Sequence, residues 1–197
     1  QGAKSDVHSG TYGGTFMNPI QALVQIVESM HDSDGKIRIA GFYDDVRSLS
    51  ETERSHFEAV PYDEDVYKKE LGVDELFGEP GYSTYERAWA RPTLELNGIW
   101  GGYQGEGMKT VIPSKAHAKI SCRLVPDQDP EKIARLLIAH IEHHAPKGVK
   151  VTASKISGFA DPYLIPYDHP GNQAARAVHK ELYGKEPYYT RMGGTIP

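Results

Sequence analysis

The chain has 197 residues, of which 39% are hydrophobic and 25% charged, as in an ordinary soluble globular protein of one domain or one domain and part of another. A net charge of −5 with scattered Lys and Arg argues against a nucleic-acid surface. No run approaches the roughly 18 apolar residues of a membrane span, and no secretory signal opens the chain. The single cysteine, Cys122, excludes an internal disulfide framework and predicts a cytoplasmic protein.

The first strong element is a helix, because Asn18 can cap it and Pro19 occupies the first helical position. Its apolar residues recur at helical spacing: Ile20, Leu23, Ile26, Val27 and Met30. Residues 31–92 instead hold charge clusters and short aromatic anchors. They predict a long ordered insertion with short helices near Glu51–Glu58 and Asp63–Leu71, since a structureless loop of that length is unusual.

Strands are predicted next. Thr93–Trp100 alternates, with Leu94, Leu96 and Trp100 on one face. The clearest strand follows Pro113, and its alternation places small or apolar residues on one face: Ala116, Ala118, Ile120, Cys122 and Leu124. The other face is polar: Lys115, His117, Lys119, Ser121 and Arg123. A helix then begins at Asp129-Pro130, and Val149–Ser157 is predicted to be a further strand.

With a short strand entering His8, the order of elements is strand, helix, strand, strand, helix, strand. This order predicts an α+β domain of the ferredoxin-like, split βαβ type. A helix from Asp168 to a glycine stop at Gly184 and a strand at Glu186–Arg191 come after that domain, so we expect the chain to enter another domain. The chain opens without a methionine and its last residues resemble a turn, which predicts a piece of a larger protein.

His8 lies in the sequence Asp6-Val7-His8-Ser9-Gly10, between a strand end and a glycine-rich turn. An exposed histidine held there by the backbone suits a hydrogen-bond donor or an acid–base group. The alternative is a turn in which Asp6 and Ser9 satisfy backbone amides. Asp6 and His8 are two apart and could both contact a metal, but two ligands do not make a site.

Two further sets of polar residues are candidates for a site. Arg123 lies on the polar face of the best strand, thirteen residues after Thr110, and an arginine fork on a rigid strand suits a substrate carboxylate. The alternative is a solvated face. His140 and His144 have the i, i+4 spacing of a zinc site, but they lack the glutamate of the His-Glu-x-x-His order and lie off the apolar stripe. A solvated helix face is therefore the favoured interpretation for the histidines.

The motifs together resemble those of the carnosinase-like dipeptidases, in the metallopeptidase family that includes acetylornithine deacetylase and succinyl-diaminopimelate desuccinylase. The segment Asp6–Gly10 with Gly13-Gly14 resembles the opening of that family's lid domain. Further motifs follow in the family's order: Gly41–Asp44, Pro92–Leu94, Asn97–Ile99, Lys109–Pro113, Arg123–Pro126 and Gly193–Pro197. The resemblance covers essentially the whole chain, and the ordered combination is its specific feature.

This resemblance implies a subunit in which a catalytic domain binds two zinc ions and a ferredoxin-like lid pairs with a second lid in a homodimer. Residues 1–160 correspond to the lid, with residues 31–92 as its insertion, and residues 161–197 to a fragment of the catalytic domain. The parent is expected to hydrolyse dipeptides or N-acyl amino acids. The family's zinc ligands lie outside the stretch matched here, so no metal ligands and no activity are expected in this chain alone.

The resemblance also implies roles for single residues. His8 matches a histidine that reaches into the partner's site and stabilises the developing oxyanion. Arg123 matches the arginine that binds the substrate's terminal carboxylate, and Thr110 a nearby polar substrate contact. Three residues match a catalytic-domain loop that lines the pocket: Gly193, Gly194 and Thr195. The chain departs from some relatives at Asp161, where they carry a histidine, and at Gly194, where they carry a serine.

Two other functions stay open at this point. An autonomous homodimerising or small-molecule-binding module needs neither His8 nor Arg123, since a free edge strand is sufficient for pairing. A self-sufficient hydrolase predicts amidase activity in this chain with added zinc.

Overall fold

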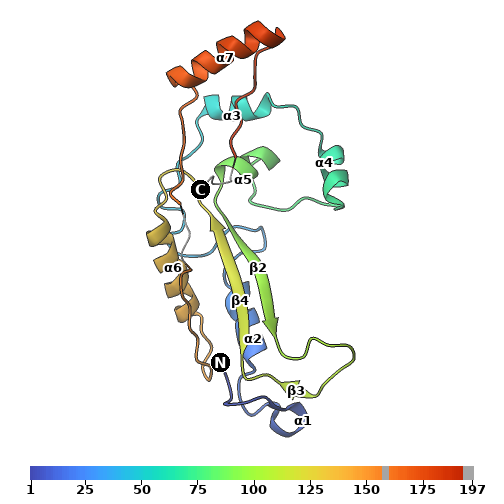
Figure 1. The fold of residues 1–197 in the computed structure, drawn as a ribbon. Coiled ribbons are helices and arrows are strands. Elements are labelled where there is room, and N and C mark those ends of the chain that lie inside the picture. The colour runs from blue at the N-terminus through green and yellow to red at the C-terminus, as the bar shows by residue number, and fades with distance from the viewer. Residues whose placement is uncertain (157–159, 193–197) are drawn as a thin grey trace. The chain divides into compact units, whose positions relative to one another are not determined.

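The computed structural model describes residues 1–156 and 160–192 (Figure 1). It is a mixed α/β protein with small antiparallel sheets. Two compact units are distinct. The first comprises Gln1–Asp44, Thr93–Arg123 and Asp129–Phe159, and the second comprises Asp45–Pro92, Leu124–Gln128 and Ala160–Pro197. Residues 45–92 of the predicted insertion therefore group with the C-terminal segment, whereas residues 31–44 belong to the unit that contains the sheets.

The first unit contains all four strands found in the described part of the chain. Its elements are β1 (Val7–His8), α1 (Ser9–Tyr12), α2 (Pro19–Glu28), β2 (Thr93–Gly101), β3 (Val111–Ile112), β4 (Ala116–Arg123) and α6 (Pro130–His143). The strands form two antiparallel pairs, β1 with β3 and β2 with β4. The predicted helices at Pro19 and Pro130 are confirmed: Asn18 caps α2 and Asp129 caps α6 through their side-chain oxygens.

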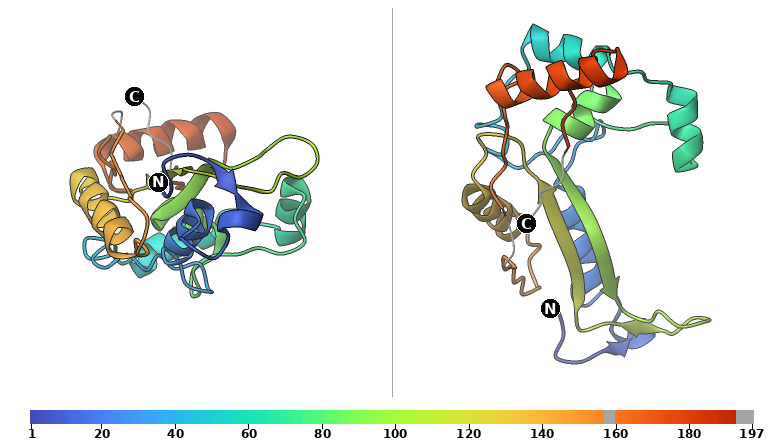
Figure 2. Two further views of the ribbon diagram at one scale, coloured as in Figure 1. Left: turned by 90° about the horizontal axis from the view of Figure 1, so that it is seen from below. Right: turned by 45° about the horizontal axis from the view of Figure 1, so that its top comes forward.

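The pair β2–β4 is the main sheet of this unit, and its register changes once. Thr93 lies opposite Arg123 at one end and Gly101 opposite Ala116 at the other, with a bulge between Leu96 and Gly98. Along β4 the predicted alternation is confirmed, because half-buried small or apolar residues alternate with exposed polar ones. Helix α2 lies against β4, as Figures 1 and 2 show.

The predicted face of Trp100 was wrong. Side chains alternate with a period of two, so the extra residue of a bulge reverses which face the following residues occupy. Trp100 therefore lies on the polar face, where its ring stacks on His117 with centroids 5.0 Å apart and planes 8° apart. The ammonium group of Lys119 lies 5.8 Å from the centre of the same ring.

The core of the first unit lies where α2, the segment after it and the sheet meet. Met30 and Phe42 are the largest fully buried side chains. Other buried apolar residues of this unit are Ala22, Ile26, Ile37, Ile39, Leu94, Ile112 and Ile133. The predicted apolar stripe is the face of the helix that packs, because Ile26 and Met30 are buried and its other members, Ile20, Leu23 and Val27, are half-buried.

The strand predicted at Val149–Ser157 is not found among residues 149–156. Lys150 exchanges two backbone hydrogen bonds with Gln1, at 2.7 and 2.8 Å. Gly2 donates a further backbone hydrogen bond to Ser114, at 2.9 Å. Lys150 and Gln1 thus form a single residue pair, and one pair is too short to be a β-ladder.

The second unit is helical. It contains α3 (Glu51–Glu58), α4 (Glu64–Leu71), α5 (Thr84–Ala90) and α7 (Pro170–Tyr183). The predicted helices α3, α4 and α7 are confirmed, and α7 ends at Gly184 in the left-handed conformation, with φ of 68°. Helix α5 was not predicted. The strand predicted at Glu186–Arg191 is not formed, since these residues pair with no strand in the described part of the chain.

Candidate functional site

The short pair β1–β3 brings His8 beside Thr110. Val7 lies opposite Ile112 and His8 opposite Val111, and the amide of Ser9 donates to the carbonyl of Thr110 at 2.9 Å. The His8 Nε2 atom and the Thr110 hydroxyl are 2.9 Å apart. Two residues 102 positions apart, each predicted as a site residue, thus form one hydrogen-bonded pair at an exposed edge.

Asp6 stabilises the β1–β3 pair through a contact with the backbone of Ser114. Its Oδ1 atom accepts a hydrogen bond from the backbone amide of Ser114 at 2.7 Å. The backbone and side-chain hydrogen bonds from Ser114 lower the pKa of Asp6, so the carboxylate is ionised at neutral pH. Asp6 therefore ties the start of β1 to the turn before β4, and the amide that it accepts from is 108 residues away rather than in the local turn of the alternative interpretation.

The contacts of His8 determine which of its nitrogens carries the proton. Its Nδ1 atom accepts a hydrogen bond from the amide of Gly10 at 3.1 Å. In the neutral imidazole an accepting Nδ1 leaves the proton on Nε2, so His8 donates through Nε2 and the Thr110 hydroxyl accepts. The exposed ring thus presents a neutral N–H donor whose orientation is set by the backbone.

Arg123 occupies the other end of the same unit. It is the last residue of β4, is exposed on the polar face and lies opposite Thr93. The described part of the chain offers its guanidinium no hydrogen bond or ion pair. Seven strand steps of about 3.3 Å separate Arg123 from Ala116, a span of about 23 Å. Helix α1 and strand β3, which directly follow His8 and Thr110 in the sequence, lie beyond the Ala116 end of β4 in Figure 1.

His8 and Arg123 of one chain are therefore too far apart for one dipeptide. Two extended residues span at most about 7 Å. The three remaining predicted site residues, Gly193, Gly194 and Thr195, lie outside the described residues. Asp161 lies in the second unit and is exposed.

The His, Cys, Asp and Glu side chains in the described part of the chain do not form a metal site. Across residues 1–156 and 160–192, no three His, Cys, Asp or Glu side chains are grouped so that they could hold an ion. Oδ1 of Asp6 and both nitrogens of His8 already have partners within the chain. On α6, His140 Nε2 lies 2.9 Å from the Ser29 hydroxyl.

The histidines of α6 form a ring cluster. The rings of His140 and His144 stack with centroids 4.0 Å apart, and His143 meets His144 edge-on at 5.0 Å. Burial lowers the pKa of His140, and the nearby charges of His144, His143 and Arg38 lower it further, against the hydrogen bond from Ser29. His140 is thus held in its neutral form by its surroundings.

This cluster predicts a loss of stability in mild acid. The unfolded chain takes up a proton at the ordinary pKa of about 6.5, whereas folded His140 does so only at lower pH. Stability is therefore complete above about pH 6.5 and falls as the pH drops towards the folded pKa. We expect His140→Gln to reduce the fall in Tm between pH 7 and pH 5, whereas His179→Gln on α7 should not. Parallel Tm profiles for all three proteins would contradict this prediction.

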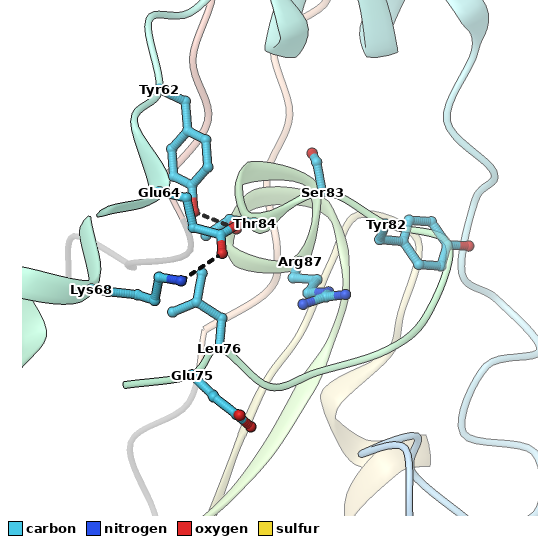
Figure 3. A pocket seen from close by; sticks show the side chains of 9 residues that line it. All are labelled: Tyr62, Glu64, Lys68, Glu75, Leu76, Tyr82, Ser83, Thr84 and Arg87. Atoms are coloured by element: carbon cyan, nitrogen blue, oxygen red, sulfur yellow. Dashed lines mark hydrogen bonds and ion pairs between the residues drawn. The ribbon is translucent and has the colours of Figure 1, made fainter. Parts of the chain in front are cut away.

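The second unit has a pocket between α4 and α5, of about 480 Å³ (Figure 3). Its charged rim is largely satisfied within the chain, since Lys68 pairs with Glu64 at 2.9 Å and Arg87 donates to the carbonyl of Glu79 at 3.0 Å. Tyr62 shares a 2.8 Å hydrogen bond with Thr84. None of the predicted site residues lines this pocket.

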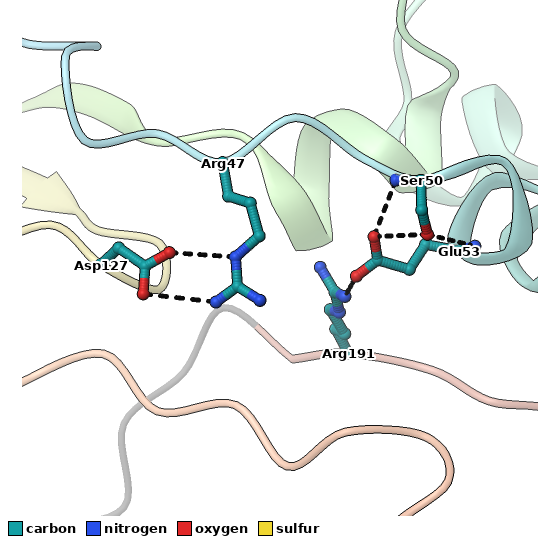
Figure 4. A network of polar contacts seen from close by, with 5 residues as sticks. All are labelled: Arg47, Ser50, Glu53, Asp127 and Arg191. Carbon is teal, nitrogen blue, oxygen red and sulfur yellow. Dashed lines mark hydrogen bonds and ion pairs between the residues drawn. The ribbon is translucent and has the colours of Figure 1, made fainter.

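A second polar network was missed from the sequence. Arg47 forms a two-pronged contact with Asp127, at 3.0 and 3.3 Å, and Glu53 pairs with Arg191 (Figure 4). Glu53 also caps α3 together with Ser50. The Ser-x-x-Glu spacing is a sequence signal for such a cap, but the distant arginine has no local signal.

Comparison with known proteins identifies the family of this chain. Residues 2–149 match the family described as "Peptidase dimerisation domain". The chain belongs to this family. Its predicted membership of the carnosinase-like metallopeptidases is thereby confirmed, and His8, Thr110 and Arg123 all lie within the matched part.

Relatives of this peptidase dimerisation domain are metallodipeptidases. The chain is 32% identical over 200 residues to the Cys-Gly metallodipeptidase dug1 of Schizosaccharomyces pombe, and covers 42% of that protein. It is also 32% identical over 195 residues to the Beta-Ala-His dipeptidase of Homo sapiens, covering 98% of this chain and 38% of the relative. The chain thus spans about two fifths of the length of these curated relatives.

Solved structures of the same group have the same fold. The crystal structure of human carnosine dipeptidase 1 matches 99% of this chain with a TM-score of 0.82 at 30% identity, over 42% of its own chain. An M20 family metallo-carboxypeptidase from Sulfolobus solfataricus, Sso-CP2, matches 99% with a TM-score of 0.83 at 34% identity, over 44% of its own chain. No helix in the two described ranges is long and apolar enough to cross a membrane.

Proposed function

We propose that this chain is the lid and dimerisation part of a metal-dependent dipeptidase that acts as a homodimer. The observation that carries the proposal is the match to the peptidase dimerisation family, whose relatives are named as Cys-Gly and Beta-Ala-His dipeptidases. The expected substrates are dipeptides or N-acyl amino acids. The expected metals are two zinc ions. In this proposal those ions, and the activity that depends on them, need the part of the parent outside this chain.

The proposed role of His8 is to stabilise the oxyanion that forms when the scissile carbonyl is attacked. A neutral Nε2–H, fixed by the amide of Gly10, is a donor that needs no rearrangement of the backbone during the reaction. The Thr110 hydroxyl accepts from this donor, and its proposed role is to contact the substrate beside His8. In the proposed site, His8 and Thr110 therefore act together as one hydrogen-bonded pair.

The proposed role of Arg123 is to bind the substrate's terminal carboxylate. Its guanidinium is exposed on a rigid strand and presents a planar fork that matches a carboxylate with two hydrogen bonds. Gly193, Gly194 and Thr195 remain proposed pocket residues on the strength of the family resemblance alone.

The distance between these groups supports a site shared by two subunits. His8 and Arg123 of one chain cannot contact the same dipeptide, but His8 of one subunit and Arg123 of another can. A free edge is available for pairing, since β2 bonds only to β4 within the described residues, and Leu96 and Ile99 near that edge are 43% and 54% exposed. A two-fold dimer uses the same edge twice and completes two sites.

The ferredoxin-like arrangement of the lid is part of this proposal. Its pattern requires the first strand to lie between the third and the last. Gln1 pairs with Lys150 on one side while Gly2 bonds to Ser114, next to β4, on the other. Pairing on both sides is what the first strand of this arrangement requires, so these hydrogen bonds support the proposal.

Helix α7 supports the proposed catalytic-domain fragment, and Cys122 supports a cytoplasmic parent. Val178, Leu182 and Tyr183 are 54%, 69% and 67% exposed, so α7 has an apolar face that the rest of a catalytic domain can cover. Burial raises the pKa of Cys122 to about 11, so its thiol stays protonated and unreactive. A lone half-buried thiol accords with a cytoplasmic parent.

Mixing two inactive variants of the parent tests the shared site. In a mixed dimer of His8→Ala and Arg123→Met subunits, one site receives both native residues if they come from different chains. After denaturation and random reassociation about half of the dimers are mixed, so about a quarter of wild-type activity should return. No recovery, with mixed dimers verified by mass spectrometry, would mean that both residues act within one chain or not at all.

Dipeptidase assays of the isolated 197-residue chain and of the full-length parent test the two other functions. The self-sufficient hydrolase predicts dipeptide cleavage by this chain with added zinc, and the proposal predicts none. The autonomous module predicts that the full-length parent also has no dipeptidase activity. The metallodipeptidase names of the relatives do not favour that module.

A further inference from the structure

The loop that joins β2 to β3 (residues 102–110, Figure 1) folds around one of its own side chains. The hydroxyl of Tyr103 donates to the carbonyl of Glu106 at 2.8 Å. The ammonium group of Lys109 lies 4.6 Å from the centre of the same ring. Tyr103 therefore contacts both the middle of the loop and its end before β3, as in compact loops that pack on their own side chains.

The backbone at Gly105 lies directly against this ring. A Cβ atom added at Gly105 would lie 2.6 Å from the Tyr103 hydroxyl oxygen and 2.8 Å from the ring carbon that bears it. Both distances are far shorter than the roughly 3.5–4.0 Å of a favourable non-bonded contact. A side chain at position 105 would therefore push the Tyr103 ring out of its place in the loop.

The loop is closed by this side chain rather than by backbone pairing. Within the described chain, residues 103–108 make no backbone–backbone hydrogen bond. Met108 is 98% exposed and Gln104 is exposed as well, so neither side chain packs inside the loop. The contacts of the Tyr103 ring therefore determine how this part of the loop is closed.

The loop returns to β3 at the residue that pairs with His8. The carbonyl of Lys109 accepts from the amide of Val111 at 2.9 Å, which makes a three-residue turn around Thr110. The Thr110 carbonyl accepts from the amide of Ser9 at 2.9 Å, and its hydroxyl lies 2.9 Å from His8 Nε2. Because Lys109 begins this turn, a shift of Lys109 turns the Thr110 side chain relative to His8.

We propose that Tyr103 is a positioning residue: by closing the loop and holding Lys109, it keeps the Thr110 hydroxyl against His8. This inference rests on the proposed function, in which His8 and Thr110 act together on the substrate. Tyr103 acts through Thr110 and needs no contact with the substrate itself. The glycine at position 105 is part of the same device, because it leaves room for the ring.

Amide hydrogen exchange in the full-length parent, resolved to single residues, reports on the position of Thr110. The amides of Ser9 and Val111 donate to the carbonyls of Thr110 and Lys109, so both should be protected in the wild type. In Tyr103→Ala we expect these two amides to exchange about fivefold faster, with the β2–β4 ladder unchanged. Gln104→Ala alters an exposed neighbour in the same loop and is the matched control, which should exchange like the wild type.

Dipeptide hydrolysis by the same variants measures the effect on the reaction. We expect Tyr103→Ala to lower kcat/KM roughly fivefold, because a turned Thr110 no longer orients the substrate beside His8. Tyr103→Phe removes only the hydrogen bond to Glu106 and keeps the ring beside Lys109, so its loss should be smaller. On a Thr110→Val background Tyr103→Ala should have no further effect, since both changes act through one hydroxyl.

Gly105→Ala displaces the same ring by an independent route. The φ of Gly105 is not positive, so the backbone itself accepts alanine. The added methyl group should displace the Tyr103 ring and reproduce the lower kcat/KM of Tyr103→Ala. Combined with Tyr103→Ala it should change nothing more, because the ring is then absent. An equal loss with and without the ring would mean that the methyl group acts elsewhere, against the role of Tyr103.

The outcomes distinguish this inference from the proposed function. If the wild-type parent cleaves no dipeptide, the proposed function fails, and the exchange of the Ser9 and Val111 amides still decides whether Tyr103 holds Thr110. If the wild type is active and Tyr103→Ala matches Gln104→Ala in exchange and kcat/KM, the parent is a dipeptidase and the positioning role is wrong. Faster exchange throughout the β2–β4 ladder with unchanged kcat/KM would also overturn the inference, since Tyr103 would then contribute to stability alone.

Discussion

Replacing His8 by alanine in the full-length parent should reduce kcat for dipeptide hydrolysis by about 10²- to 10³-fold and change KM little. Loss of one preorganised donor to an oxyanion has this magnitude, because the interaction forms only as charge develops on the carbonyl oxygen. His8 suits this role because the Gly10 amide holds its Nδ1 atom and leaves the proton on Nε2. Steady-state kinetics on a dipeptide substrate provide the measurement.

Two matched variants sharpen the His8 experiment. Thr110→Val keeps the shape of the side chain and removes the hydroxyl that meets Nε2, so we expect a smaller loss than with His8→Ala. His143→Ala removes an exposed histidine from α6 and should leave the kinetics unchanged. Equal, small effects of His8→Ala and His143→Ala would refute the oxyanion role.

Replacing Arg123 by methionine should lower kcat/KM for dipeptides by about a hundredfold. A hydrogen bond to a charged group contributes about 1.5–3 kcal/mol, and the fork makes two of them to one carboxylate. Arg123→Lys should recover only part of the loss, because an ammonium group cannot make the planar two-pronged contact. Lys119→Met is the control, since Lys119 is an exposed cation on the same face of β4, four residues before Arg123.

A modified substrate identifies what Arg123 binds. The wild type should cleave a dipeptide with a free terminal carboxylate much faster than the same dipeptide with that carboxylate converted to an amide. Arg123→Met should cleave the acid and the amide at similar rates. If the variant still strongly prefers the acid, the carboxylate is bound by another group and the proposed role of Arg123 is wrong.

Local signals made most of the helices predictable. A side chain that caps a helix lies within three residues of the amide it serves, so Asn18 and Asp129 mark their helices in the sequence. The same holds for Gly184, whose left-handed conformation ends α7. Helix α5 was missed although Ser83 and Glu86 form a cap of the Ser-x-x-Glu type, because it lies in a charge-rich stretch without apolar periodicity.

The strands were less predictable because pairing joins distant residues. The alternation of β4 is visible in the sequence, but the bulge after Leu96 that turns Trp100 to the polar face depends on the register with β4. Residues 186–191 contain two tyrosines and a threonine, which favour a strand, yet the described chain provides no partner for them. A strand needs a neighbour, and composition alone does not identify one.

The sequence by itself determined the family, through the order of its motifs, together with the helix caps and the alternation of β4. The three-dimensional structure alone decided which of the motif residues lie together. It joined His8 to Thr110 across 102 positions, separated them from Arg123 by the length of a strand, and paired Glu53 with Arg191 across 138 positions. The physical reason is range: caps and side-chain periodicity act within a few residues, whereas a binding site and its supports are made by contacts that only the folded backbone brings together.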